Sequence, residues 1–193
     1  DTDRHLLVIG EDRSGRSTLL LRIIRELTAV HGPDEARFLV LDPDRRLPAL
    51  PFRPGQLLGS ATTGREAAAL IAAHAPGLAA RLPAPGTPPD LAATRSWWGS
   101  PADIYLVADN YERLAGATPF APLLPLLDHA GDIGLHLIVA RQARGIGRAL
   151  YEGLVAGLKD TGCPAVLLSG PEAEGAVVGR TRLTPRPPGR GVW

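Results

Sequence analysis

The sequence predicts an α/β domain with a mainly parallel central sheet and helices on both faces. Three observations lead to this prediction. Apolar runs of strand length alternate with longer segments of helical periodicity, which is the pattern of consecutive βαβ units. A glycine-rich loop follows the first apolar run, and a carboxylate follows a later one. Both features are typical of P-loop nucleotide-binding domains.

Composition narrows the class of protein. The 193 residues are 45% hydrophobic, which is enough to bury one core, and we expect a single domain over 1–193. With 21 Lys and Arg against 20 Asp and Glu, the net charge is +1, and this balance does not predict DNA binding. The longest uncharged runs, 67–80 and 114–127, have 14 residues each, below the ~18 that span a bilayer. A lone cysteine indicates a reducing compartment, so we expect a cytoplasmic domain.

The chain begins at Asp1, contains no Met, and enters its first apolar run at His5. We therefore expect a fragment of a longer polypeptide, with any membrane contact made by parts that precede it.

The apolar pattern assigns each element. Runs rich in Val, Ile and Leu predict five strands at 5–9, 37–42, 104–108, 135–140 and 165–168. Helical spacing predicts helices at 14–30, 63–82, 120–130 and 146–158, the second possibly interrupted at Pro76-Gly77. Proline and glycine predict loops at 43–59 and 82–89 and an irregular tail through Arg190.

The loop between the first strand and the first helix carries the chemistry. It reads Gly10-Glu-Asp-Arg-Ser-Gly-Arg-Ser-Thr18 and fits G-x-x-x-x-G-K-[ST], except that Arg16 replaces the lysine. In such a loop, backbone N–H groups and the helix N-terminus bind phosphate. We expect Gly10, Ser14, Gly15 and Arg16 to cradle phosphates, Ser17 to bind Mg²⁺, and Thr18 to contact the α-phosphate. A plain strand-to-helix turn is the alternative.

A magnesium site in a P-loop domain also needs a carboxylate at the end of another buried strand. Asp109 follows Ile104-Tyr-Leu-Val-Ala108 and fills this place. The next residue is Asn110, whose amide cannot accept a proton from water, so the sequence predicts weak or absent hydrolysis. Glu112 is a substitute base only if it reaches the site. Arg16 adds to this expectation, because a guanidinium does not fit where a slender lysine stabilises the β- and γ-phosphates.

Several segments resemble one family of translocases. Leu39-Val-Leu-Asp42-Pro43 resembles a strand of FtsK/SpoIIIE-type ATPases, and Gly134-Leu-His-Leu-Ile-Val-Ala-Arg141-Gln142 resembles their sensor strand, with Arg141 in place of Thr. Arg95-Ser-Trp97-Trp98 followed by Asp103-Ile-Tyr-Leu-Val-Ala-Asp109-Asn110-Tyr111 is similar to the last ATPase domain of EccC, the multi-ATPase component of actinobacterial type VII secretion systems. The likeness extends over essentially the whole chain.

This resemblance implies a RecA-like P-loop domain, one of several ATPase domains in tandem on a membrane-anchored chain that assembles into rings. It implies that Gln142 senses the γ-phosphate. It also implies a degenerate last domain that holds ATP and Mg²⁺ and recognises the C-terminal secretion signal of small helical WXG-type substrate proteins.

The sequence offers one candidate for the signal-peptide groove. Ile146, Leu150 and Leu154 form an apolar stripe on a predicted helix, with Tyr151 beside it. Packing of this stripe in the core is the alternative, and we favour it. Core packing is also the expected role of Trp97 and Trp98.

Three functions remain open from the sequence. The first is an ATP-binding domain that recognises a secretion signal and hydrolyses weakly or not at all. The second is an active FtsK-like motor that moves protein or DNA. The third is a structural adaptor with an empty loop, which an ion pair between Arg16 and Glu11 or Asp12 would favour.

Overall fold

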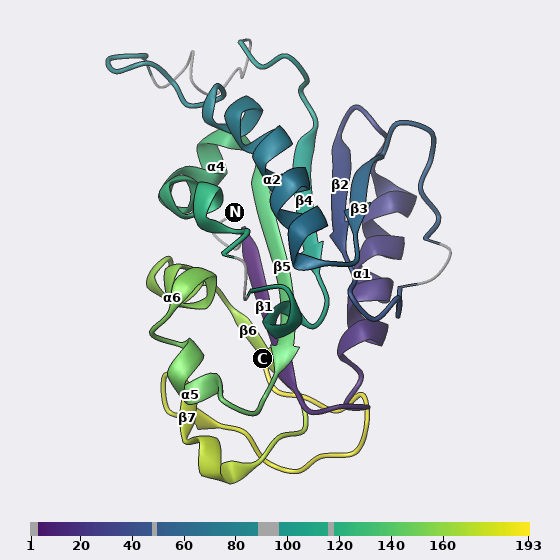
Figure 1. The fold of residues 1–193 in the computed structure, drawn as a ribbon, viewed down its shortest axis with the longest axis vertical. Coiled ribbons are helices and arrows are strands. Elements are labelled where there is room, and N and C mark those ends of the chain that lie inside the picture. The colour runs from purple at the N-terminus through teal and green to yellow at the C-terminus, as the bar shows by residue number, and fades with distance from the viewer. Residues whose placement is uncertain (1–3, 48–49, 89–96, 116–117) are drawn as a thin grey trace.

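The computed structural model describes residues 4–47, 50–88, 97–115 and 118–193. A six-stranded sheet, parallel throughout, forms its centre (Figure 1). In spatial order the strands are β3 (Leu57–Ala61), β2 (Ala36–Leu41), β4 (Asp103–Ala108), β5 (Leu135–Gln142), β1 (His5–Gly10) and β6 (Ala165–Leu167). The predicted fold class is confirmed, and all five predicted strands are present.

Helices cover both faces of the sheet. The α-helices are α1 (Arg16–Val30), α2 (Gly64–Ala79), α4 (Ala130–Ile133), α5 (Ile146–Ala149) and α6 (Gly153–Asp160). Three 3-10 helices, η1 (Tyr111–Arg113), η3 (Ala121–His129) and η4 (Glu172–Glu174), and a small antiparallel pair, β7 (Ala176–Val178) with β8 (Thr181–Arg182), complete the elements described. Within these ranges no helix is both long and apolar enough to span a lipid bilayer.

Alternation along the strands divides the interior into two cores. Leu7 and Ile9 of β1 pack in a core with α2, η3 and α6, whereas Val8 packs in a second core with Leu20 and Ile24 of α1. Because the six strands are parallel, their carboxyl ends meet at one edge of the sheet and their amino ends meet at the other. These two edges carry the two sites described below.

The structure corrects three predictions of local structure. β3 lies where we predicted a loop, because it is a half-exposed edge strand with too few buried positions to produce an apolar run. The predicted helix at 146–158 is broken into α5 and α6, because Glu152 is extended and Gly153 has φ of +55°. The segment predicted as a helix at 120–130 is mostly the 3-10 helix η3, which contains Pro122 and Pro125.

Helix α2 is continuous, so Pro76 does not interrupt it. The proline lies in the last turn, where it removes little of the hydrogen-bond ladder. At the other end Thr63 and Glu66 form a capping box: Thr63 Oγ1 accepts from the Glu66 N–H at 3.2 Å, and the Glu66 carboxylate accepts from the Thr63 N–H at 3.1 Å.

Candidate nucleotide-binding site

The glycine-rich loop runs from the end of β1 into α1 at the carboxyl edge of the sheet. A Cβ on Gly10 would lie 2.4 Å from Ser14 Oγ and 2.9 Å from the Cβ of Leu168, so only glycine fits there. Gly15 caps α1 with φ of +108°, a left-handed conformation that favours glycine. Ser14 Oγ is buried and has no hydrogen-bond partner among the residues described. The local backbone therefore has the form of a phosphate-binding loop.

Ser17 and Asp109 meet across this edge, as the sequence predicted. Ser17 Oγ donates to Asp109 Oδ2 at 2.5 Å, and the backbone N–H of Asn110 donates to Asp109 Oδ1 at 3.0 Å. Asp109 is fully buried, and this burial raises the pKa of its carboxyl above the ordinary value, against the opposing effects of Ser17 and Arg16. A hydroxyl and a carboxylate oxygen so close together are suitable hard ligands for Mg²⁺.

Arg16 lies at the position of the usual lysine, but its charge is directed at carboxylates of this chain. Its side chain is 3% exposed, with Nη2 3.2 Å from Asp12 Oδ1 and Nη1 3.9 Å from Glu112 Oε1. Nη1 is buried and has no hydrogen-bond partner in the described part of the chain. The ion pair with Asp12 is the feature that we expected of a structural adaptor.

Asp12 also contacts the predicted γ-phosphate sensor. Gln142 Nε2 donates to Asp12 Oδ1 at 3.1 Å, so this one oxygen faces both Arg16 and Gln142. The Gln142 backbone N–H donates to Glu112 Oε2 at 3.2 Å. Glu112 therefore reaches the site, a point that the sequence left open.

A second group of charges surrounds Asn110, which has φ of +45°. Its Nδ2 donates to Asp44, and the Arg113 guanidinium pairs with the same carboxylate. Arg46 lies 3.7 Å from Asp44 and 3.9 Å from Asp12, which links the two groups. We did not predict Asp12, Asp44, Arg46 or Arg113 as site residues. All but Asp12 follow the carboxyl ends of β2 or β4, and that placement was the signal available in the sequence.

The sensor strand β5 carries Arg141 next to its last residue, at the position where the resemblance to FtsK-type ATPases led us to expect threonine. Arg141 is 6% exposed, and its guanidinium donates to the backbone oxygens of Gln142 at 3.0 Å and Arg144 at 3.2 Å. Burial lowers the pKa of Arg141, and the nearby Glu112 opposes that shift. The side chain thus bonds to the backbone of its own loop.

Two of the cavities that adjoin the loop also reach α1. One, of about 490 Å³, lies over Asp12, Gly15, Arg16, Ser17 and Arg46. The other, of about 650 Å³, lies between α1 and the C-terminal tail and is lined by Gly15, Thr18, Arg22, Val192 and Trp193, among others. Thr18 lines both cavities, so a ligand that fills them passes beside it.

The tail itself is attached to the loop. The Gly189 N–H donates to the Ser14 carbonyl at 2.8 Å, and Val192 exchanges two 2.9 Å backbone hydrogen bonds with Leu167 of β6. In Figure 1 the tail, in yellow, crosses the same end of the molecule as the connection between β1 and α1. The sequence predicted only an irregular tail, because nothing in its composition says where it docks.

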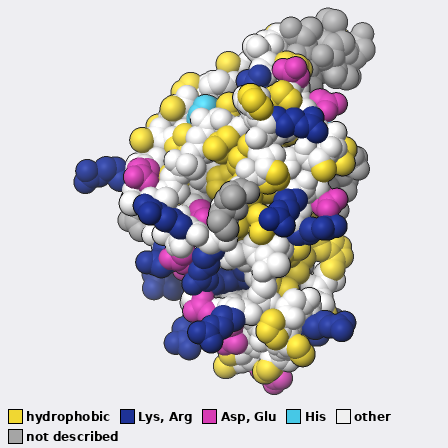
Figure 2. Space-filling model, turned by 90° about the vertical axis from the view of Figure 1, so that its right-hand side faces the viewer, with side chains coloured by type: hydrophobic (Ala, Val, Ile, Leu, Met, Phe, Trp, Pro, Cys, Tyr) yellow, Lys and Arg dark blue, Asp and Glu magenta, His cyan; other side chains and the backbone are white. Residues whose placement is uncertain are grey.

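The surface around α1 carries charges of both signs. Figure 2 shows Lys and Arg side chains interspersed with Asp and Glu on this face, with no uniform basic field.

The predicted groove residues do not form an open groove. Ile146, Leu150 and Leu154 are 0%, 6% and 1% exposed and belong to the core with α2 and η3, which was the favoured alternative. Only Tyr151 is exposed, at 77%, because the break between α5 and α6 turns it outward. Trp98 is buried as predicted, whereas Trp97 is 37% exposed and donates its Nε1–H to the Arg81 carbonyl at 3.0 Å.

The chain is similar to secretion-system proteins, although no family model matches it. It is 39% identical to the ESX-4 secretion system protein EccC4 of Mycobacterium tuberculosis, over 97% of this chain and 15% of that protein. It is 38% identical to the ESX secretion system protein EccC of Thermomonospora curvata, over 100% of this chain and 15% of that one. The chain therefore spans about one seventh of these relatives.

Solved structures agree with these relatives. ATPases 2 and 3 of Thermomonospora curvata EccC, in complex with a signal sequence peptide, match with a TM-score of 0.93 at 37% identity, over 98% of this chain and 34% of that one. ATPases 2 and 3 of Geobacillus thermodenitrificans EssC match with a TM-score of 0.66 at 14% identity, over 98% and 37%, and show the fold alone.

Fold and site together define a P-loop ATPase domain of the FtsK/SpoIIIE kind. The chain belongs to the EccC family of type VII secretion ATPases and is a C-terminal ATPase domain of that family. Its kinship with ATPases implies nucleotide binding.

Proposed function

We propose that this domain binds ATP with Mg²⁺, hydrolyses it weakly or not at all, and recognises the C-terminal secretion signal of a small helical WXG-type protein. The observation that supports ATP binding with little hydrolysis is the environment of Arg16, the cation of the loop. Arg16 replaces lysine and faces the carboxylates of Asp12 and Glu112, while Asn110 stands where a catalytic acid is usual. These two replacements support a site in which phosphate binding is kept and turnover is weakened.

The two adjoining cavities support a specific placement of ATP. Phosphates fit the 490 Å³ cavity, where the loop backbone and Arg16 provide donors. Ser17 and Asp109 would hold the Mg²⁺, whose charge would neutralise phosphate oxygens there. The base fits the larger and more apolar cavity beside Trp193.

The ion pair between Arg16 and Asp12 does not by itself favour an empty loop. Arg16 is buried but the Asp12 side chain is 61% exposed, so water screens the pair, and screened pairs contribute only about 0–1 kcal/mol. A triphosphate carries several negative charges and makes charge-assisted hydrogen bonds that are stronger than neutral ones. We therefore expect phosphate to displace Asp12 from Arg16 and Gln142.

Calorimetric titration with ATP, with and without Mg²⁺, tests nucleotide binding. Arg16→Ala removes the loop cation and should weaken binding about tenfold or more, because a buried charged donor is lost. Arg25→Ala, at an exposed position of α1 that lines neither cavity, is the matched control and should bind as the parent does. Absence of ATP binding by the parent chain would support the structural adaptor.

The proposal of signal recognition is supported by the solved structure of Thermomonospora curvata EccC ATPases 2 and 3, which is a complex with a signal sequence peptide. Fluorescence anisotropy with a labelled C-terminal peptide of a WXG-type protein tests it, with a scrambled peptide as control. Tyr151→Ala examines the one exposed member of the predicted groove. A peptide that binds no better than the scrambled one would contradict this half and leave the nucleotide half standing.

We infer the wider setting from the same relatives. The domain would act beside preceding ATPase domains of one chain, in a ring on the cytoplasmic side of a membrane that other parts of the protein cross. Size-exclusion chromatography with light scattering of a longer chain that includes the preceding domains tests assembly.

One observation favours an active motor as the second candidate. Glu112 lies 3.9 Å from Arg16 and accepts a hydrogen bond from Gln142, so a carboxylate that can accept a proton is present at the phosphate site. Phosphate release that Glu112→Gln abolishes would support the motor, whether it moves protein or DNA.

A further inference from the structure

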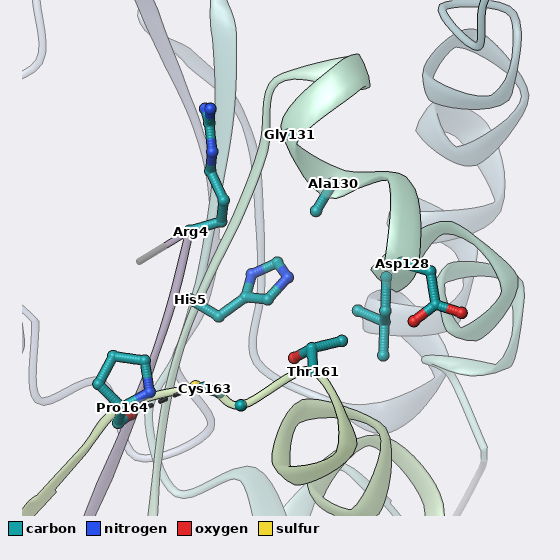
Figure 3. Close-up of a pocket in the computed structure, with 10 residues that line it drawn as sticks. Arg4, His5, Asp128, Ala130, Gly131, Thr161, Cys163 and Pro164 are labelled. Carbon is teal, nitrogen blue, oxygen red and sulfur yellow. Dashed lines mark hydrogen bonds between the residues drawn. The ribbon is translucent and has the colours of Figure 1, made fainter. Parts of the chain in front are cut away.

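A second polar cavity lies at the opposite edge of the sheet, where the amino ends of β1 and β6 meet η3. It measures about 290 Å³, near the lower end of the roughly 300–1,000 Å³ typical of ligand pockets. Figure 3 shows His5 projecting into it from β1, with Asp128 on the far wall and Thr161 below. None of these residues takes part in the nucleotide site.

The protonation of His5 follows from its contacts. Its Nδ1 accepts a hydrogen bond from the Leu137 backbone N–H at 3.0 Å, so in the neutral ring the proton is on Nε2. Burial, with smaller effects of His136 and Arg4, lowers the pKa of His5 to about 4. At neutral pH the ring is therefore uncharged and presents an Nε2–H donor.

This donor has no acceptor among the residues described, although His5 is only 6% exposed. Figure 3 shows the Nε2 side of the ring directed into the cavity. A buried donor without an acceptor costs about 1–3 kcal/mol. An acceptor placed in the cavity would recover that cost, so the ring favours a ligand that carries an exposed oxygen.

The charged side chains around the cavity further restrict the chemical class of ligand that it favours. Arg4 lines the cavity with its guanidinium over Gly131: a Cβ on that glycine would lie 3.5 Å from Arg4 Nε. Asp128 is exposed on the opposite wall and belongs to η3. The cavity is therefore lined by a cation, a neutral donor and an anion, and in Figure 3 the Arg4 side chain extends away from the His5 ring along the wall that faces Gly131.

We propose that this cavity binds a carboxylate, with His5 Nε2–H as the donor to one oxygen and Arg4 as the counter-charge, and that Asp128 favours a ligand with a basic group beyond that carboxylate. Two sources share this chemistry: the C-terminal carboxylate of a peptide and a free carboxylic acid. The proposal stands on the geometry of His5 and does not depend on nucleotide binding.

The test is an NMR titration of the 193-residue chain in which the ring nitrogens of His5 are observed in long-range ¹H–¹⁵N spectra. The probes are acetyl-Ala-Ala-Lys with a free C-terminal carboxylate, the same peptide as its C-terminal amide, and acetate. The proposal predicts a saturable shift of His5 Nε2 with the free peptide, and affinity about tenfold lower for the amide, because a charge-assisted hydrogen bond is lost.

The remaining probes identify the source. Acetate that binds as well as the peptide indicates a free acid, and acetate that binds far more weakly indicates a peptide terminus. A glutamate-ended peptide that binds as well as the lysine-ended one would overturn the role given to Asp128. No saturable shift with any probe, or equal shifts with carboxylate and amide, would overturn the proposal.

Variants separate binding from packing. His5→Phe keeps a ring but removes the donor and should abolish the peptide-induced shifts of neighbouring backbone amides. Arg4→Gln should weaken binding about three- to tenfold, which is the range for one charge-assisted contact at a partly exposed site. His129→Phe, an exposed position paired with Asp132, is the control and should bind normally. If His5→Phe fails to fold, Arg4→Gln decides the outcome.

Discussion

The two edges of the central sheet differ in how many of their buried polar side chains are paired with carboxylates of the same chain. At the carboxyl edge, Arg16, Gln142 and Asn110 all contact carboxylates of the same chain. At the amino edge, His5 presents a donor with no acceptor among the residues described. A ligand that binds Arg16 and Gln142 at the first edge must displace Asp12, although Ser14 Oγ and Arg16 Nη1 there also lack a hydrogen-bond partner in the described part of the chain. A ligand at the second edge would instead supply a missing acceptor to His5. The number of charged side chains at an edge therefore does not show whether their hydrogen-bonding groups are free to bind a ligand.

The largest effect should come from the titration of His5. Because its pKa is about 4 when folded and ordinarily 6.5, the unfolded chain binds the extra proton between these values, and stability falls as pH falls through that window. At pH 4.5 this contributes a loss of roughly 2–2.5 kcal/mol relative to pH 7. Urea unfolding at both pH values should show that loss in the parent chain and less of it in His5→Phe. Equal losses would mean that His5 titrates normally.

At the carboxyl edge the most damaging small change should be Gly10→Ala. The added Cβ would lie 2.4 Å from Ser14 Oγ, so the loop must shift, at a cost of about 1–3 kcal/mol for an overpacked site. Gly99→Ala is the matched control, since a methyl group there would meet no atom of the described residues within 4 Å beyond its own chain neighbours. Chemical denaturation of both variants makes the comparison, and equal stability would contradict the close packing of the loop.

A substitution in the C-terminal tail should have a smaller effect, on the affinity for ATP. Trp193 is 77% exposed at the rim of the cavity where we place the base. Loss of a base–aromatic stack typically costs about 1–3 kcal/mol, so Trp193→Ala should weaken ATP binding at least fivefold by calorimetry. Trp97→Ala, near the amino edge, should leave the affinity unchanged. Unchanged affinity in Trp193→Ala would place the base elsewhere.

The smallest expected effect concerns Asp12, whose carboxylate would compete with phosphate for Arg16 and Gln142. Asp12→Asn removes the carboxylate that faces both Arg16 and Gln142, so ATP should bind about threefold more tightly, in keeping with the ~0–1 kcal/mol of an ion pair that water screens on the Asp12 side. The control Asp34→Asn removes an exposed carboxylate next to Arg37. Weaker binding in Asp12→Asn would show that Asp12 assists the nucleotide instead of competing with it.

Sequence patterns identified most of the fold because the inner strands are buried and apolar. The loop from Gly10 to Thr18 and the pairing of Ser17 with Asp109 also follow from motif spacing, since a strand end and a helix start fix those positions. β3 could not be recognised in the same way, because a half-exposed edge strand lacks an apolar pattern.

The missed features depend on contacts distant in sequence. Spacing cannot show that Gly189 bonds to Ser14, or that Glu112 reaches Gln142. Spacing also cannot show that His5, the first residue of β1, has an unpartnered donor. That property depends on the backbone N–H of Leu137, which donates to His5 Nδ1 and leaves the proton on Nε2.

We propose that the carboxyl edge of the sheet binds ATP without hydrolysing it. Single-turnover phosphate release, with the domain in excess over ATP and Mg²⁺ present, tests this most directly. We predict that ATP recovered from the complex is intact after many times the period needed for binding. Phosphate release in the parent chain that is lost in Glu112→Gln would contradict it and establish Glu112 as the base of a working ATPase.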